Sequence, residues 1–408
     1  MLQIDADRFR ESFESYSEIG ATDDGGLHRL ALTDADERVR ETFVADLESL
    51  GLDVRVDAVG NVFGRREGTN PDADPVLVGS HLDSQPYGGR YDGQLGVLAA
   101  LETLRTLDDE GIETDRPIEI VDWTNEEGSR FQHAMLGSGV FAGVTDLDEA
   151  LALTDADGAS LGEELERIGY AGDADVSPFD VHSHLELHVE QGPTLDANET
   201  SVGVVEGVFG MAWQRVTIRG ESDHAGPSPM HTRTDAMAAA ADAASELNDL
   251  PNRLGPDAVA TIGEFSVEPD SVNVIPSRAE FTVDVRSYDD ALVADAKAAI
   301  RDEVEAACRR HGTDYEIEDV WEIPHTEYDP EVRKVVADAA ERADVSYERI
   351  VSGAGHDAKY VNNLAPTAMV FVPSVDGITH NEAEFTEWDD CVAGANVFAN
   401  ATVELATE

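Results

Sequence analysis

Residues 75–84 read PVLVGSHLDS, an apolar run that ends in a cluster of polar side chains. The run Pro75–Gly79 predicts a buried strand, and an amphipathic helix is expected to follow it over Leu95–Leu107. A second apolar run, Ile118–Trp123, predicts another buried strand. Buried strands that alternate with helices are typical of a largely parallel sheet covered by helices.

The same alternation extends over both ends of the chain but not over its middle. Helices are predicted where apolar residues recur at helical spacing, over a segment containing Phe9, Phe13 and Tyr16 and over Ala35–Leu50. Near the end of the chain the expected order is a helix, a strand and a helix: Pro330–Ala343, Thr367–Val372 and Trp388–Leu405.

From about Gly210 the pattern changes to strands with one buried face, separated by helices. The expected elements are Ala212–Arg219, Thr234–Leu250, Ala279–Arg286 and Asp290–His311. The predicted fold is therefore an α/β domain with a central mixed, largely parallel sheet, interrupted by an inserted α+β domain. The α/β domain comprises residues 1–209 and 325–408, and the insertion residues 210–324.

The chain is long and strongly acidic. Its 408 residues include 85 acidic and 28 basic ones, so the formal net charge is −57. Such a charge repels phosphate, which excludes nucleic acids and anionic membranes as expected partners. No apolar stretch approaches the ~18 residues that cross a bilayer. The start MLQIDADRFRES does not resemble a signal peptide, so the cytoplasm is the expected location.

The acidic residues are spread along the whole chain, whereas only three lysines occur: Lys297, Lys334 and Lys359. Salt at ~1 M screens charges beyond ~3 Å, against ~10 Å at 0.1 M. We therefore expect a protein adapted to molar intracellular salt, and the alternative is an unusually acidic protein without that adaptation.

Five polar clusters follow predicted strands or precede a predicted helix. They are Gly79–Ser84, Gly88–Gly93, Trp123–Gly128, His182–Gln191 and Gly377–Glu384. Each has an ordinary structural explanation when it is taken singly. Their shared position points to function, because α/β sheets bind ligands at the carboxyl ends of their strands.

The fourth cluster contains two candidate ligands, His184 and His188. On a helix their spacing would form a zinc pair, but the alternating apolar residues around them predict a strand. At ~3.3 Å per residue the two side chains would then lie ~13 Å apart. Only His188 is therefore predicted to bind metal, with Gln191 beyond it as a substrate contact.

The clusters supply nitrogen and oxygen ligands without sulfur. The predicted set is His81, Asp92, Glu127, His188 and His380. It suits two divalent ions such as zinc, manganese, cobalt or nickel, with Asp83 holding the other ring nitrogen of His81. The neighbour of Glu127, Glu126, would point to the opposite side of an extended backbone, toward the reacting water.

Seven ordered motifs carry a resemblance to a known family. They are HLDS (81–84), GGRYDG (88–93), NEEGSRF (125–131), ELHVEQGP (186–193), DHAG (223–226), SGAGHDA (352–358) and THNE (379–382). With them the chain resembles the amidase/hydantoinase–carbamoylase branch of the M20 metallopeptidase superfamily. Tyr91 stands where phenylalanine is frequent and Thr379 where serine is frequent, and neither departure removes a ligand.

The resemblance implies roles for individual side chains. Asp92 would bridge two ions, the first also held by His81 and His188 and the second by Glu127 and His380. The remaining roles are a general base (Glu126), an oxyanion stabiliser reaching the partner subunit's site (His224) and substrate contacts (Asn273, Arg286, Gly355, His356). The inserted domain would be a dimerisation lid, which makes a homodimer the expected assembly.

The expected activity is metal-dependent hydrolysis of a C–N bond in a linear ureido compound that carries a carboxylate. The preferred substrates are N-carbamoyl-L-amino acids, which would give the amino acid, CO2 and ammonia. Alternatives are β-ureidopropionase and allantoate or ureidoglycine amidohydrolase activity, and more distantly aminoacylase or dipeptidase activity. A binding protein without catalysis is the alternative of a different class.

Overall fold

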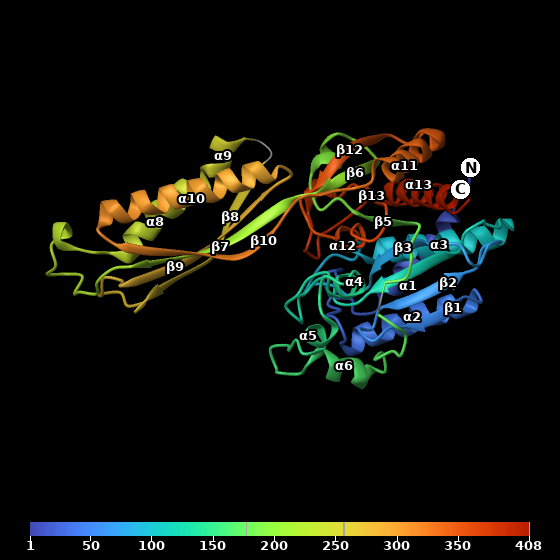
Figure 1. Cartoon of the computed structure of the whole chain (residues 1–408), viewed down its shortest axis with the longest axis horizontal. Helices are drawn as coiled ribbons and strands as arrows, with labels where there is room; N and C mark the ends of the chain where they lie inside the picture. The colour runs from blue at the N-terminus through green and yellow to red at the C-terminus, as the bar shows by residue number, and fades with distance from the viewer. Residues whose placement is uncertain (177, 256–257, 408) are drawn as a thin grey trace. The chain divides into compact units, whose positions relative to one another are not determined.

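The computed structural model describes residues 1–176, 178–255 and 258–407. The chain forms two compact units, one made of residues 1–206 with 327–408 and the other of residues 207–326 (Figure 1). The boundaries predicted from the sequence, 209/210 and 324/325, lie a few residues from these and stay a prediction. Among the described residues, no helix combines the length and the apolar character needed to span a membrane.

The larger unit is built on a nine-stranded sheet. Its strands are β1 (Asp53–Val56), β2 (Val62–Arg66), β3 (Val76–His81), β4 (Ile118–Trp123), β5 (Ser183–Val189), β6 (Val202–Val208), β11 (Thr326–Glu327), β12 (Tyr347–Ser352) and β13 (Thr367–Val372). The spatial order is β1-β2-β4-β3-β5-β13-β6-β11, and β12 pairs with β6. Strands β4, β3, β5 and β13 run parallel, whereas β1, β2 and β6 pair antiparallel, so the predicted mixed and largely parallel sheet is confirmed.

The helices of this unit are α1 (Ala6–Ser17), α2 (Asp34–Ser49), α3 (Gln94–Glu110), α4 (Leu136–Phe141), α5 (Leu147–Leu151), α6 (Leu161–Ile168), α7 (Thr194–Ala197), α11 (Pro330–Ala343), α12 (Ala358–Val361) and α13 (Trp388–Ala406), with the short 3-10 helix η2 (Val375–Gly377). The five helices predicted for this unit are present as α1, α2, α3, α11 and α13, whereas the shorter helices α4, α5, α6, α7 and α12 were not predicted. The N-terminus lies beside α13, where Leu2 N donates to Asn400 Oδ1 at 2.9 Å (Figure 1).

Both faces of the central strands are buried. On β3, Val76 and Val78 belong to the main core beneath α3 and α13, whereas Leu77 belongs to a smaller aromatic cluster. That cluster includes Phe141 of α4 and Val361 of α12. Burial on both sides explains why the parallel strands are continuous apolar runs rather than alternating ones.

The smaller unit is an antiparallel sheet with helices on one face. Its elements are β7 (Gly210–Arg219), η1 (Met230–Thr232), α8 (Ala236–Asn248), α9 (Leu250–Leu254), β8 (Ala258–Glu268), β9 (Arg278–Ser287), α10 (Asp290–His311) and β10 (Asp314–Ile323), and the strand order is β10-β7-β9-β8. Along β9 every second residue is buried, including Phe281 and Val283, which pack with α8 and α10 in one core.

Two features of this unit differ from the predictions. The helix expected over 234–250 ends at Asn248 and is followed by the separate helix α9, whose first turn holds Pro251. Proline lacks the N–H that a continuing helix needs. The edge strands β8 and β10 were not predicted, because so many of their residues are exposed that little apolar periodicity remains.

Candidate metal centre

Polar side chains gather where the parallel strands of the larger sheet end. His81 is the last residue of β3, Glu126 and Glu127 follow β4, and His188 is the penultimate residue of β5. His380 lies in the segment that follows β13. Because these strands are parallel neighbours, their carboxyl ends open at one edge of the sheet.

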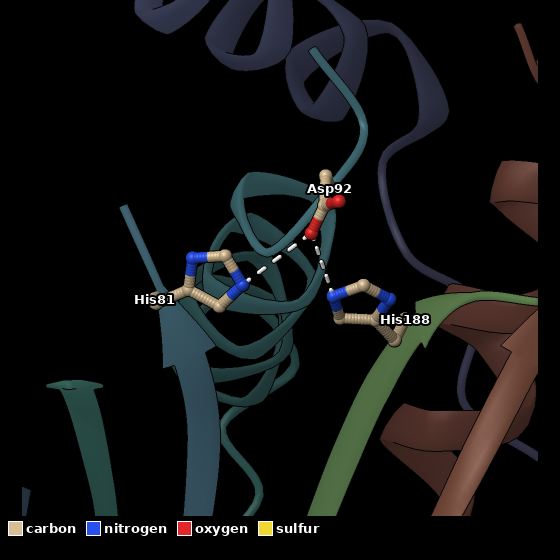
Figure 2. A group of neighbouring side chains, drawn as sticks. All are labelled: His81, Asp92 and His188. Carbon is tan, nitrogen blue, oxygen red and sulfur yellow. Dashed lines mark ion pairs between the residues drawn. The ribbon is translucent and has the colours of Figure 1, made fainter. Parts of the chain in front are cut away.

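Asp92 lies between two of these histidine rings (Figure 2). Its Oδ1 is 3.4 Å from His81 Nε2 and 3.1 Å from His188 Nε2. Its Oδ2 is 3.6 Å from His380 Nε2. Gly93 follows with φ +62°, and a Cβ at that position would lie 2.3 Å from His81 Cε1, so only glycine lets the Asp92 loop approach the ring this closely.

The structure brings all five predicted ligands together. One atom each of His81, Asp92 and His188 lies within 4.8 Å of the others, and the same holds for Asp92, Glu127 and His380. The two groups share Asp92. In the described part of the chain His81 Nε2 is buried without a hydrogen-bond partner, and an unsatisfied imidazole nitrogen among carboxylates fits a metal ligand.

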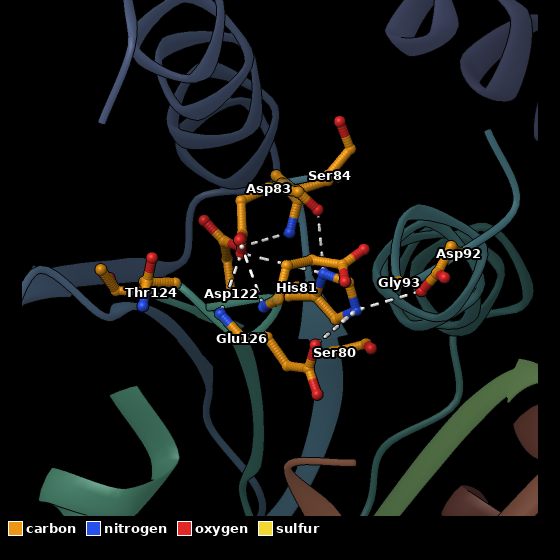
Figure 3. Close-up of polar contacts among 12 residues, drawn as sticks. Ser80, His81, Asp83, Ser84, Asp92, Gly93, Asp122, Thr124 and Glu126 are labelled. Atoms are coloured by element: carbon orange, nitrogen blue, oxygen red, sulfur yellow. Dashed lines mark hydrogen bonds and ion pairs between the residues drawn. The ribbon is translucent and has the colours of Figure 1, made fainter. Parts of the chain in front are cut away.

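Asp83 orients both His81 and the glutamate segment. The backbone oxygen of Asp83 lies 3.0 Å from His81 Nδ1, which leaves Nε2 facing Asp92 (Figure 3). The Asp83 carboxylate accepts from Glu126 N at 3.1 Å and from Glu127 N at 3.4 Å. The predicted hydrogen bond to His81 is therefore made by the Asp83 backbone, whereas the Asp83 carboxylate lies 3.8 Å from His81 Nδ1 as an ion pair and also fixes the two glutamates.

Glu126 and Glu127 take different positions, but the extended backbone predicted for them is wrong: β4 ends at Trp123, and the two residues lie in a turn in which Asn125 has a positive φ of 54°. Glu127 belongs to the group with Asp92 and His380, whereas Glu126 Oε2 is 3.6 Å from His81 Nε2. Burial raises the pKa of the Glu126 carboxyl well above its usual value, and the nearby acidic groups Asp357 and Glu127 raise it further. A carboxyl with a raised pKa is suited to exchange protons near neutral pH.

The charges of Asp92 and His81 stabilise one another. Burial alone would raise the pKa of Asp92, but the adjacent rings of His188 and His81 hold it well below its usual value. Burial would lower the pKa of His81, but Glu126 and then Asp92 raise it well above the usual value. The site thus stabilises positive charge at its centre, which is what cation binding requires.

Comparisons with known proteins identify the family. The model of peptidase family M20/M25/M40 matches residues 77–404. The chain belongs to this family.

Similar M20 proteins cover the full length of the chain. An N-carbamoyl-L-amino-acid amidohydrolase of Rhizobium meliloti is 43% identical to this chain. The alignment covers 99% of this chain and 97% of that protein. An allantoate amidohydrolase of Escherichia coli is 34% identical, with 98% of each chain covered. The crystal structure of a hydantoinase/carbamoylase family amidase from Burkholderia multivorans superposes with a TM-score of 0.93 at 48% identity, over 100% of this chain and 99% of that one.

The M20 site contains further buried groups beside His188. The His356 ring lies 4.5 Å from the His188 ring, and burial holds the pKa of His356 well below its usual value. Glu186 was not predicted: it accepts from Ser80 Oγ at 2.7 Å and from Ala358 N at 3.0 Å. Gly355 lies against the Met135 side chain. The position of Glu186, two residues before a ligand on a buried strand, was the available signal.

Two glutamine amides reach into the second group of ligands. Gln191 Nε2, predicted as a substrate contact, donates to Asp92 Oδ2 at 2.8 Å. Gln85 was not predicted, and its Nε2 lies 2.7 Å from His380 Nε2. Both amides therefore border the position that a second cation would take.

The predicted residues His224, Asn273 and Arg286 belong to the smaller unit. His224 is exposed, and its backbone forms an isolated antiparallel β-bridge with Val274. In the adjacent pair, Ala225 N donates a hydrogen bond to Asn273 O at 3.0 Å. Arg286 donates to Asp284 Oδ2 at 2.8 Å. These backbone contacts bring the segments of His224 and Asn273 together within this unit, and the catalytic and substrate roles of all three residues stay predictions.

Proposed function

We propose that this protein is a two-metal hydrolase that cleaves a C–N bond of linear ureido compounds. The preferred substrates are N-carbamoyl-L-amino acids, which give the amino acid, CO2 and ammonia. The observation that carries the proposal is the pair of ligand groups that share Asp92. The full-length similarity to an N-carbamoyl-L-amino-acid amidohydrolase supports the substrate class.

The proposed ligands of one ion are His81, Asp92 and His188, and those of the other are Asp92, Glu127 and His380. Their nitrogen and oxygen donors suit zinc, manganese, cobalt or nickel. When bound, such a pair of cations supplies Lewis-acid activation of water and of the scissile carbonyl.

Glu126 is the proposed general base. Its carboxylate would take a proton from the attacking water and return it to the departing nitrogen, which leaves as a neutral amine. Burial and the raised pKa support this role, because a more basic carboxylate takes a proton from water more readily. Gln191 and the segment Gly355–His356 would contact the substrate.

Allantoate hydrolysis is the second candidate. Allantoate amidohydrolases of Escherichia coli and Bacillus subtilis are 34% and 32% identical to this chain over nearly its whole length. Both substrates are linear ureido compounds with a carboxylate, so the same centre could act on either.

The experiment is an ammonia-release assay at molar salt with added divalent cations. The substrates are carbamoyl-L-amino acids, carbamoyl-β-alanine and allantoate. Turnover fastest on carbamoyl-L-amino acids supports the proposal, and turnover fastest on allantoate selects the second candidate. Stoichiometric binding without ammonia release would instead indicate a binding protein.

The predicted homodimer, the cytoplasmic location and the adaptation to molar salt are part of the same proposal. Sedimentation velocity at molar salt measures the assembly. A mass near twice 43.9 kDa supports the dimer, and a mass of one chain contradicts it.

A further inference from the structure

Glu384 is a buried carboxylate that neither the predictions nor the proposed reaction uses. Its side chain is 4% exposed, although it lies in the segment that also carries His380. Its Oε1 accepts from Tyr91 N at 3.1 Å and from Asp92 N at 3.2 Å. One oxygen therefore holds the two peptide groups that lead into Asp92.

The loop before Asp92 is shaped to receive this carboxylate. A Cβ on Gly89 would lie 2.1 Å from Glu384 Cδ, so any larger residue at 89 would displace the side chain. Burying a carboxylate is costly unless its oxygens are paired, and here Oε1 is paired with the two N–H groups of the loop. Glu384 Oε2 is also buried and lacks a hydrogen-bond partner in the described part of the chain.

Two glutamine amides contact the His380 ring: Gln85 Nε2 lies 2.7 Å and Gln191 Nε2 3.3 Å from its Nε2. His380 has a positive φ of 51° and its side chain is 48% exposed. Its ring lies 3.6 Å from Asp92 Oδ2, the oxygen that faces the second group of ligands. The hydrogen bonds of Glu384 thus join the two backbone segments that present Asp92 and His380 to the same position.

We infer that Glu384 is a positioning residue that aligns Asp92 with His380 and so sets the affinity of the second metal position. This inference rests on the proposed two-metal centre. If Glu384 acts by accepting these hydrogen bonds, metal binding requires the accepting oxygen of its side chain but not the negative charge of the carboxylate.

Metal affinity tests the inference without reference to turnover. Metal-free protein at molar salt is titrated with Mn²⁺ or Zn²⁺ by calorimetry, and bound metal is counted after gel filtration. We expect Glu384→Ala to weaken binding of the second metal equivalent by about 10–100-fold and of the first by less, because only the second group also contains His380. Glu384→Gln should bind both equivalents nearly as the unaltered protein does, because its amide oxygen can accept the same two N–H groups.

Gly89→Ala is the independent variant, because its methyl group would push the carboxylate away from an intact Glu384. Gly89→Ala should weaken the binding of the second metal equivalent as Glu384→Ala does. Glu387→Ala is the matched control, since Glu387 is exposed and makes no side-chain cap bond at the start of α13. Circular dichroism and thermal unfolding of each variant identify any that has lost its fold.

The outcomes separate the inference from the function it rests on. If the unaltered protein binds no metal, the two-metal centre fails. If it binds two equivalents and Glu384→Ala binds both with unchanged affinity, the inference fails. Equal loss in Glu384→Gln and Glu384→Ala would also overturn it, because the carboxylate would then act through its charge or as a ligand.

Discussion

At the scale of single residues, the adjacent residues Glu126 and Glu127 have different roles because the backbone directs their side chains to different positions. Glu127 joins Asp92 and His380, whereas Glu126 lies beside His81. Glu126→Gln keeps the size of the side chain and removes its ability to take a proton. We expect kcat to fall by at least about 10²–10⁴-fold with metal content unchanged.

Ammonia release and metal analysis of the same preparations check this prediction. Glu166→Gln, an exposed glutamate of α6, is the matched control and should retain full activity. Undiminished turnover in Glu126→Gln would remove Glu126 from its proposed role.

His184 is a buried histidine that lies outside the candidate ligand groups. Its Nδ1 lies 3.1 Å from Leu77 O, and it belongs to neither ligand group. Burial lowers its pKa to about 4, below the ~6.5 of an unfolded chain, so the unfolded state binds more protons between these values. The contribution of neutral His184 to stability is therefore present above pH 6.5 and lost as the pH falls toward 4.

Between pH 7 and pH 5, the titration of His184 lowers the free energy of unfolding by about 2 kcal/mol. His184→Met removes the titrating group, so its free energy of unfolding should fall less between pH 7 and pH 5 than that of the unaltered protein. Denaturant unfolding at molar salt measures both. Parallel pH profiles for the two proteins would show that His184 does not titrate in this range.

At the scale of elements, the position of a ligand depends on how closely helix α3 packs on strand β5. A Cβ on Gly96 of α3 would lie 2.1 Å from Leu187 O, the residue before His188. Gly96→Ala should therefore lower the free energy of unfolding by about 1–3 kcal/mol, because one backbone segment must move.

Denaturant unfolding checks the Gly96 prediction. Glu110→Ala, an exposed substitution at the end of the same helix, should stay within about 0.5 kcal/mol of the unaltered protein. A stabilised Gly96→Ala protein would mean that helix propensity outweighs the close approach.

Prediction from the sequence worked where local pattern and burial agree. The fully buried strands β3, β4 and β13 and the amphipathic helix α10 lie where their apolar residues indicated. Strands β8 and β10 were missed because they are sheet edges with many exposed residues.

For the site, strand ends and motifs indicated the five candidate ligands that the structure brings together. They did not indicate Glu186, Gln85 or Glu384. The importance of Gln85 and Glu384 comes from contacts across long stretches of chain, such as that between Glu384 and Asp92 N, which no local pattern encodes.

At the scale of the whole molecule, the charge sets the conditions in which the fold is stable. With 85 acidic and 28 basic residues, fewer than one cation exists for every three carboxylates, so ion pairing cannot neutralise them. Raising KCl from 0.1 to 2 M should raise Tm by about 10 °C or more through screening. Thermal scans check this, with equal osmolality of sucrose as the control, and a Tm independent of salt would contradict it.

The most direct test of the central claim is the number of metal ions that each chain binds. Metal-free protein, reloaded with Mn²⁺ or Zn²⁺ at molar salt and analysed by plasma mass spectrometry, should hold two ions per chain. Asp92→Asn should lose both or bind them at least about 100-fold more weakly, because Asp92 belongs to both ligand groups. A single ion in the unaltered protein, or two tightly held ions in Asp92→Asn, would contradict a centre built around Asp92.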